Sequence, residues 1–505
     1  MEECDCSEKH LDDAKDDTPE LQYRLDIATR YYSKNADLLD TISYNLMLPW
    51  VTLLSLLLSC CVVRESAARS VEDKIMNIIM GSIYLLLVIV VSPVGVIGIV
   101  LWLIICRNFK QEKYTYVEVN SDCESAFISK RNENKYFTFG SANVLLAPEF
   151  VCRLNNVTDS KTRAAAIAEI FTNHTGKHLH NLDQEDAGYE VCSKLESLHS
   201  EVPYTDFLCL QEVWERSYAL ILIDRLKDEF KYFLYDVGEY SWDINHCMLG
   251  SGLMFASKKP ILAADFKTFS YRTKHAKYTS QGVLCVKVLL SDSGLYRHVG
   301  FISNMHTQAF QGDEPVIPRQ VTDAYVFIHM FKYKFTEKTD IVDFDVICGD
   351  FNADNMSPAD EDFQYHVIFK EYCDVCVEKP GKDHDWAIGT EMRQMTMHSE
   401  ELSDPEIFKE ILADDSERRR FLLDADVIVH GHHLRMAVAN RDKDGLIRPV
   451  PWGGMRRIDR ILFNKTISGS VPVGYCFSTA LTNLTDHLPI YMTLTNKHCM
   501  ETKTL

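Results

Sequence analysis

Residues 345–352 read Asp345-Val346-Ile347-Cys348-Gly349-Asp350-Phe351-Asn352, an apolar run that ends in an acid and an amide. Asp350 and Asn352 alternate around Phe351, so both side chains can point to one face at the end of a strand. A carboxylate and an amide placed together can hold a metal ion, an attacking water and a phosphoryl oxygen. Taken alone, the same residues fit an Asp/Asn-rich turn equally well.

Two earlier segments also place polar side chains in apolar strands. The first, Ser141-Ala142-Asn143-Val144, carries Asn143, and the second, Leu208-Cys209-Leu210-Gln211-Glu212-Val213, runs into Glu212. An ionised glutamate after a buried strand needs a partner, and a divalent cation with oxygen ligands, magnesium above all, is a suitable one. The alternative for Glu212 is an ordinary strand-end residue that faces water.

Two histidines complete the set of polar residues beside apolar strands. His487 follows Asp486 and precedes the run at 488–490, so it is a candidate general base tuned by carboxylates, with Asp459 as the second carboxylate that orients it. His306 follows the run at 299–304 and is a candidate for binding a phosphoryl oxygen or protonating a leaving group. The alternative for both histidines is a hydrogen-bonded place in the core, and for His306 alone that alternative is the stronger one.

Apolar runs of strand length recur along the chain from residue 136 onward. Helical spacing separates some of them, as in Arg319–Phe335, where Val321, Ala324 and Ile328 share one face. Many strands with few strict β-α-β alternations favour an α/β layered sandwich with outer helices over a doubly wound parallel sheet. The expected strands are Phe137–Leu146, Phe207–Leu210, Leu253–Ala256, Val283–Leu290, Val299–Asn304, Val346–Cys348, Ile458–Phe463 and Ile490–Leu494.

The charge of the chain narrows the classes of function. The 505 residues carry a formal net charge of -20, which repels extended polyanions, so we expect no nucleic-acid partner. A small phosphorylated substrate stays compatible with this charge, because a bound metal reverses the local field. The 16 cysteines are scattered and residues 1–44 are acidic without a secretory signal, which together favour a reducing compartment.

Two uncharged stretches, Leu46–Val63 and Ile75–Cys106, predict membrane-associated helices. The second would reach about 48 Å as a straight helix, more than a bilayer core needs, so Pro93 is expected to make it a kinked span or a re-entrant hairpin. Cys60 and Cys61 are candidates for palmitoylation beside the membrane. On position alone, they are equally well explained as two apolar residues in an apolar segment.

These patterns divide the chain into five parts: an acidic segment 1–44, membrane-associated segments 45–106, a juxtamembrane linker 107–134, an enzymatic domain 135–495 and a tail 496–505. Arg107, Lys110 and Lys113 follow the second hydrophobic stretch with a single acid, Glu112, against them. The positive-inside bias therefore places the domain that follows in the cytosol.

The order of the motifs carries a family resemblance. Asn143, Gln211-Glu212, His306, Gly349 to Asn352, Arg457 to Asp459 and Thr485 to Pro489 follow one another as in the DNase I-like metal-dependent phosphodiesterase superfamily. Residues 234–238, 251–257 and 386–390 are further similar to the membrane-anchored neutral sphingomyelinases. The resemblance implies a two-sheet β-sandwich flanked by helices, preceded by the hydrophobic segments.

The resemblance also implies an activity and roles. The reaction is hydrolysis of membrane sphingomyelin to ceramide and phosphocholine with Mg²⁺, for which Mn²⁺ is a possible substitute. The family setting is the cytosolic face of the Golgi or plasma membrane, with an anionic phospholipid as activator. The implied roles fall on Glu212 as metal ligand, Asn143 at metal and phosphate, Asp350 at the water, Asn352 at a phosphoryl oxygen, His487 as base oriented by Asp459 beside Asp486, and His306 assisting.

One departure from the family pattern concerns a lysine expected at the substrate phosphate. Ser280-Gln281-Gly282 stands where the family has Ser-Lys-Gly, so Lys277 or Lys274 is the candidate replacement. The departure supports one alternative, a non-catalytic membrane scaffold. A second alternative is an inositol polyphosphate 5-phosphatase or another phosphodiesterase of the superfamily, whose signature Pro451-Trp452 and Asp459 to Leu462 resemble with a different spacing.

Overall fold

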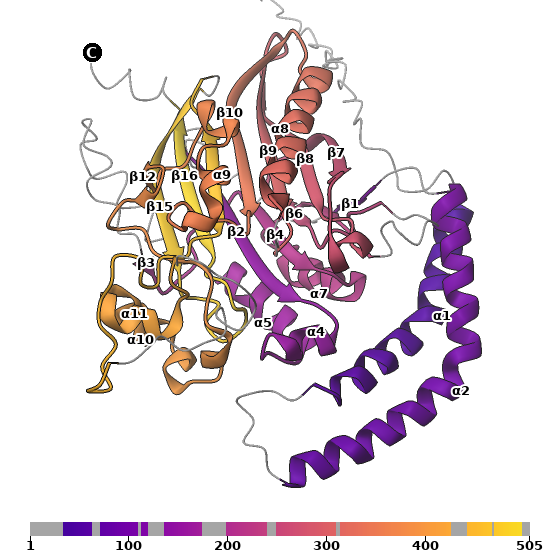
Figure 1. The fold of residues 1–505 in the computed structure, drawn as a ribbon. Helices are drawn as coiled ribbons and strands as arrows, with labels where there is room; N and C mark the ends of the chain where they lie inside the picture. The colour runs from indigo at the N-terminus through magenta and orange to yellow at the C-terminus, as the bar shows by residue number, and fades with distance from the viewer. Residues whose placement is uncertain are drawn as a thin grey trace, which may run out of the picture.

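A computed structural model describes residues 34–62, 71–109, 113–119, 136–173, 198–239, 249–309, 314–425, 442–466 and 469–496. The acidic N-terminal segment up to residue 33, much of the expected linker and almost all of the C-terminal tail lie outside these residues. The described chain forms a helical hairpin beside a sandwich of two mixed sheets (Figure 1).

The hairpin consists of α1 (Lys34–Ser59) and α2 (Val71–Phe109), which pack along each other. Both helices are long and apolar enough to cross a membrane, and many leucine and isoleucine side chains of α2 are exposed, which together indicate membrane association. Of the two arrangements expected at Pro93, the structure has the single span and not the re-entrant hairpin, since Pro93 lies inside one continuous helix. Close packing is possible because a Cβ on Gly95 would lie 2.4 Å from the Trp50 Cβ, and one on Gly98 2.7 Å from the Met47 nitrogen.

The sandwich consists of two sheets in which strands that are consecutive in sequence and strands that are far apart in sequence are both neighbours. In spatial order, the first sheet contains β1 (Thr115–Glu118), β5 (Tyr232–Tyr235), β6 (Met254–Ser257), β4 (Phe207–Val213), β2 (Tyr136–Leu146), β16 (Ile490–Asn496), β15 (Ser470–Ser478) and β3 (Leu198–His199). The second contains β11 (Tyr372–Cys373), β14 (Asp459–Asn464), β10 (Asp340–Asp350), β9 (Arg297–His306), β8 (Gly282–Asp292) and β7 (Ile261–Thr268). A small ribbon of β12 (Val377–Lys379) and β13 (Lys382–Asp383) is separate.

Aromatic side chains hold the two sheets together. The Phe344 ring of the second sheet packs edge-on against Phe137, Phe139 and Phe207 of the first, with ring centroids 5.0, 4.9 and 5.5 Å away. Such edge-to-face pairs add about 0.5–1.5 kcal/mol each to the free energy gained by burying the rings. The inward face of both sheets is therefore a dry core, and polar side chains gather where the strands end.

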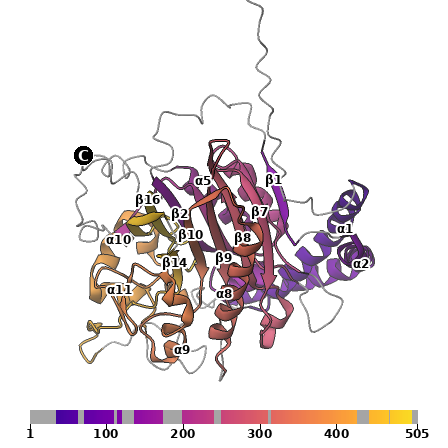
Figure 2. The ribbon, with the colours of Figure 1, turned by 90° about the horizontal axis from the view of Figure 1, so that it is seen from above.

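Helices cover the outer faces of both sheets (Figures 1 and 2). The first sheet is covered by α5 (Ser160–Thr172) and α7 (Arg216–Leu226), whose apolar side chains share one cluster with β2 and β4. The second is covered by α8 (Val316–Phe335) through the expected face of Val321, Ala324 and Ile328. The remaining helices are α4 (Glu149–Leu154), α9 (Glu361–Gln364), α10 (Pro405–Ala413) and α11 (Asp415–Phe421), with short 3₁₀ turns that include η1 (Lys274–Tyr278).

The expected α/β sandwich with outer helices is confirmed, and every expected strand is present with its ends moved by a few residues. Six strands of the sandwich were not expected: β1, β3, β5, β7, β11 and β15. Of these, β1 lies within the segment expected to be linker, where Thr115 to Glu118 pair antiparallel with β5.

A largely shielded arginine, Arg216, joins the hairpin to the sandwich. Arg216, at the start of α7, forms an ion pair with Asp40 of α1 (Nη1 to Oδ2, 2.7 Å) and another with Asp236 after β5 (2.7 Å). Its guanidinium also lies over the ring of Tyr44, 4.8 Å from the centroid. Because these side chains are largely shielded from water, salt screens this contact less than a surface ion pair.

Beside β14, a second buried network is built around one carboxylate. Asp374 Oδ2 accepts hydrogen bonds from Nη1 of Arg457 (2.9 Å) and Nη1 of Arg460 (2.6 Å), and all three side chains are almost completely buried. Burial alone would raise the pKa of Asp374, but the two guanidinium groups outweigh it and hold the pKa below its ordinary value.

We predict that Asp374→Ala lowers the free energy of unfolding by about 3–5 kcal/mol, because it leaves two buried guanidinium groups without a shared counter-charge. Urea denaturation of the detergent-solubilised chain, followed by tryptophan fluorescence, measures this loss. Asp224→Ala, which removes an exposed ion pair to Lys227, is the control and should leave the transition in place. Equal midpoints for Asp374→Ala and the wild type would contradict the prediction.

Candidate active site

Strand register gathers three of the expected residues in one row at an end of the second sheet. β10 runs parallel to β9 with Asp350 opposite His306, and antiparallel to β14 with Asp350 opposite Asp459. Asp350 therefore lies between His306 and Asp459, on adjacent strands that come from three distant parts of the sequence. His487 lies before β16 of the other sheet and reaches this row from the facing side.

Asn143 joins the two sheets at this edge. Its Nδ2 donates one hydrogen bond to Glu212 Oε1 (3.1 Å) and one to Asp350 Oδ2 (3.0 Å), while its Oδ1 accepts one from the Leu145 amide (3.2 Å). β2 and β4 are parallel neighbours, which puts Asn143 beside the strand that carries Glu212. One side-chain amide thus holds two carboxylates of like charge, one from each sheet.

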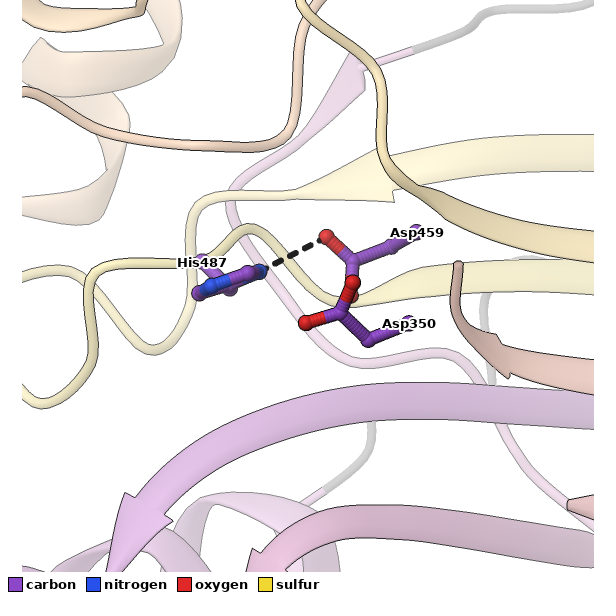
Figure 3. Close-up of side chains that lie close together, drawn as sticks. All are labelled: Asp350, Asp459 and His487. Carbon is purple, nitrogen blue, oxygen red and sulfur yellow. Dashed lines mark hydrogen bonds and ion pairs between the residues drawn. The ribbon is translucent and has the colours of Figure 1, made fainter. Parts of the chain in front are cut away.

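His487 and Asp459 form a buried pair (Figure 3). The Nδ1 of His487 and Oδ2 of Asp459 are 2.8 Å apart, which leaves Nε2 directed away from Asp459. Burial lowers the pKa of His487, but the carboxylates of Asp459, Asp350 and Asp486 outweigh it and raise the pKa well above its ordinary value. Asp486 Oδ1 lies 4.0 Å from Nε2, so it contributes charge but no close hydrogen bond.

The acids around His487 are themselves affected by burial. Burial, with the nearby charge of Asp459 second, raises the pKa of Asp350 to about 8, and burial raises the pKa of Asp486 to about 6. Asp459 Oδ1 is buried without a hydrogen-bond partner among the described residues. Such a concentration of shielded negative charge favours a bound cation, which would restore the ionised form of the carboxylates.

His306 faces the two carboxylates that Asn143 holds. Its Nε2 lies 3.7 Å from Asp350 Oδ2 and 3.9 Å from Glu212 Oε1, and burial lowers the pKa of His306. In the tautomer that carries the proton on Nε2, a neutral imidazole donates one hydrogen bond towards Glu212 and Asp350; in the other tautomer, Nε2 accepts from the Gln281 amide, which lies 3.5 Å away.

The backbone at two of these residues adopts a conformation that side chains seldom take. Glu212 has φ 62° and Asn352 has φ 49°, both in the left-handed region. Asn352 is held there by its own amide, which donates to Asp350 Oδ1 (2.8 Å), and by its Nδ2, which donates to the Thr307 carbonyl (3.0 Å). Strained backbone that its surroundings hold in place is characteristic of functional sites.

The residues at this edge fit a divalent cation that prefers oxygen. The carboxylates of Glu212 and Asp350 and the amide of Asn143 are the donor types that magnesium takes. Asp350, Asp459 and His487 also place one possible ligand atom each within 4.8 Å of one another. The Nδ1 of His487 interacts with Asp459, and Asn143 Nδ2 donates to both Glu212 and Asp350. A cation between Glu212 and Asp350 would replace that amide contact, and its placement there stays a prediction.

The other candidates lie outside this group or at its border. Asn352 lies two residues after Asp350, while Lys277 is exposed in η1. The structure places Gln281 itself, buried at the start of β8, beside His306: its Nε2 lies 3.5 Å from His306 Nε2 and donates to the Thr307 carbonyl (3.2 Å). Cys60 and Cys61 are free thiols after the end of α1, and Cys61 is exposed. Their palmitoylation stays a prediction.

Two contacts near the site were not expected from the sequence. Trp214 Nε1 lies 3.5 Å from Glu212 Oε2, and Thr390 Oγ1 accepts hydrogen bonds from the backbone amides of Ile458 and Asp459 (3.1 Å each). Thr390 belongs to a segment noted for its family likeness, and Trp214 directly follows the strand of Glu212. Neither residue stood out in the sequence as a candidate for catalysis or binding.

Comparison with known proteins places this geometry in a family. Residues 140–487, which include all six converging side chains, match the endonuclease/exonuclease/phosphatase family. The chain belongs to that family. It is a phosphodiesterase-type hydrolase related to the neutral sphingomyelinases.

Three proteins similar to this chain differ in their sequence identity and in the share of each chain that the similarity covers. Sphingomyelin phosphodiesterase 5 of Danio rerio is 26% identical, over 90% of this chain and 95% of its own length. Sphingomyelin phosphodiesterase 3 of Homo sapiens is 31% identical, over 57% of this chain and 44% of its own length. A beta toxin of Staphylococcus aureus solved with bound magnesium ions is 14% identical with a TM-score of 0.39, over 72% of this chain and all of its own.

We predict that Glu212→Gln and Asp350→Asn each weaken binding of Mn²⁺, a spectroscopic substitute for Mg²⁺, by more than about tenfold, because each removes a charged oxygen donor. Electron paramagnetic resonance of free Mn²⁺ in a titration measures the affinity. Glu215→Gln, on the same chain segment but outside the contacts of Asn143, is the matched control. Wild-type affinity in Glu212→Gln would contradict this placement of the ion.

Proposed function

We propose that this protein is a membrane-anchored, magnesium-dependent neutral sphingomyelinase that hydrolyses sphingomyelin to ceramide and phosphocholine. The observation that carries the proposal is the convergence of Asn143, Glu212, His306, Asp350, Asp459 and His487 from both sheets onto one edge of the sandwich. Similarity to a sphingomyelin phosphodiesterase over 90% of the chain supports the choice of substrate.

The proposed chemistry starts at His487. With Nδ1 bound to Asp459, the Nε2 of neutral His487 takes a proton from water as the water oxygen bonds to phosphorus. Asp350 orients that water, and the bond between phosphorus and the ceramide oxygen breaks. The ceramide oxygen leaves and takes up a proton, which gives ceramide and phosphocholine.

The remaining residues hold the phosphoryl group. Asn352 Nδ2 and the neutral imidazole of His306 are hydrogen-bond donors for its oxygens, and Gln281 supplies a neutral amide beside His306 in place of the family lysine. Lys277 is a candidate for a longer contact to the substrate phosphate. Magnesium, held by Glu212 with Asp350 and Asn143 and replaceable by Mn²⁺, would offset the negative charge that grows on the phosphoryl oxygens.

The helices fit this proposal, because a membrane lipid is the substrate. We assign residues 45–106 to membrane anchoring and 135–495 to catalysis on the cytosolic side, at the Golgi or the inner leaflet of the plasma membrane, with an anionic phospholipid as activator. Palmitoylation of Cys60 and Cys61 would add a second membrane anchor beside α1.

We predict that the detergent-solubilised protein releases phosphocholine from sphingomyelin when Mg²⁺ is present, and that EDTA abolishes the release. Glu212→Ala and His487→Ala each lower kcat by about 10²- to 10⁴-fold, since one removes a metal ligand and the other the base. Head-group release from a panel of sphingomyelin, phosphoinositides and DNA measures this, with Asp224→Ala as the control.

The panel also decides between the alternatives. Faster hydrolysis of phosphoinositides or DNA than of sphingomyelin would replace the proposal by another phosphodiesterase activity. Turnover of no phosphodiester by protein that binds Mn²⁺ would indicate a non-catalytic membrane scaffold, the reading that Gln281 left open.

The acid side of the pH profile is expected to depend on Asp486. His487 accepts a proton only when neutral, so kcat/KM falls as the pH falls through its pKa. The charge of Asp486 raises that pKa, so Asp486→Asn should lower it and move the acid limb to lower pH. Profiles of kcat/KM for Asp486→Asn and for the exposed control Asp224→Asn measure the shift. An acid limb that stays in place or moves to higher pH would contradict the assignment of His487 as the base.

A further inference from the structure

Arg456 is a buried arginine whose side chain connects two loops of the candidate active site. It precedes β14 by three residues, and 3% of the residue is exposed. Unlike Arg457 and Arg460, which pair with Asp374, Arg456 faces the loop that follows Asp350 and the segment beside His487. The sequence alone suggested no chemistry for it.

The first set of contacts holds the loop after β10. Arg456 Nη1 pairs with Asp354 Oδ2 (2.9 Å), and Nη2 donates to the Asn352 carbonyl (3.4 Å). Asp360 Oδ2 lies 3.6 Å from Nη1 and also accepts the Asp354 amide. The guanidinium therefore fixes the turn in which Asn352 has its left-handed backbone conformation.

The second set of contacts reaches the segment of His487. Arg456 Nε donates to Glu391 Oε2 (2.7 Å), and Glu391 pairs with His487 in an antiparallel β-bridge. Hydrogen bonds on both sides of this bridge hold it, from the Leu488 amide to the Thr390 carbonyl (2.9 Å) and from the Met392 amide to the Asp486 carbonyl (2.8 Å). A shift of Glu391 would therefore move the backbone of His487.

We infer that Arg456 is a positioning residue that fixes the place of His487 relative to Asn352 without contact to the substrate. The planar guanidinium presents donors in several fixed directions, so it can hold Glu391 on one side and Asp354 with Asn352 on the other. A lysine offers one point charge in its place and cannot span both. The expected effect on kcat rests on the proposed function, since the relative placement of His487 and Asn352 matters for the rate only if the protein is a phosphodiesterase.

The test compares Arg456→Lys with Arg457→Lys, a matched control one residue away whose side chain pairs with Asp374 and Asp383. We expect Arg456→Lys to lower kcat by about 10- to 100-fold, as a small displacement of reacting groups does, with KM within about twofold of wild type. We expect Arg457→Lys to lower the melting temperature and to leave kcat of the folded protein unchanged. Glu391→Gln, which keeps a hydrogen-bond acceptor but loses the charge, should lie between wild type and Arg456→Lys and serves if the latter does not fold.

A measurement that does not depend on activity separates the positioning role of Arg456 from the proposed function. Hydrogen exchange measured by mass spectrometry should rise in residues 351–356 and 485–489 of Arg456→Lys, and not in Arg457→Lys. If the wild type hydrolyses no phosphodiester, the proposed function fails, while raised exchange in both segments still supports the connection through Arg456. Wild-type kcat and exchange in folded Arg456→Lys, or equal losses of kcat in the two lysine variants, would overturn the inference.

Discussion

The hydrogen bonds of Asn143 to Glu212 and Asp350 are the contact on which the rest of the site depends. They bring two carboxylates of like charge, one from each sheet, to the same amide group. Without a donor between them, the repulsion of two shielded carboxylates would oppose the closure of the sandwich at this edge. The amide sets how far apart they lie, and His306 faces both of them.

The aromatic core and the polar edge have different roles in the fold. Phe344 and its three partners hold the sheets at a constant distance, while the register of β9, β10 and β14 decides which side chains meet at the strand ends. A slip of one residue in β10 would turn Asp350 to the other face of its sheet. The catalytic geometry is therefore a consequence of core packing, and the strained backbone at Glu212 and Asn352 is held by the same surroundings.

Much of this was predictable from sequence, because the informative residues follow local rules. Asp350 and Asn352 alternate around Phe351, and the apolar runs before Glu212 and His306 have the length and composition of buried strands. Strands such as β15 lack this signal, because Pro472 and Gly474 interrupt the run, and pairing with β16 and β3 makes it a strand. Arg456 and Arg457 are adjacent residues of the same type, and the local sequence does not indicate which of them faces the candidate active site. That distinction arises only from tertiary contacts with Glu391, Asp354 and Asp374.

The ion pairs of Arg216 restrict the orientation of the sandwich relative to the helical hairpin, which the connectivity of the chain alone would not do. A sandwich joined to the helical hairpin by one peptide segment alone could rotate freely relative to the hairpin. Here α1 is fastened to α7 as well, through Asp40 and Arg216, four residues beyond Glu212. A body attached at two points has less freedom to rotate, so the edge that carries Glu212 and Asp350 keeps a fixed orientation relative to α1 and α2.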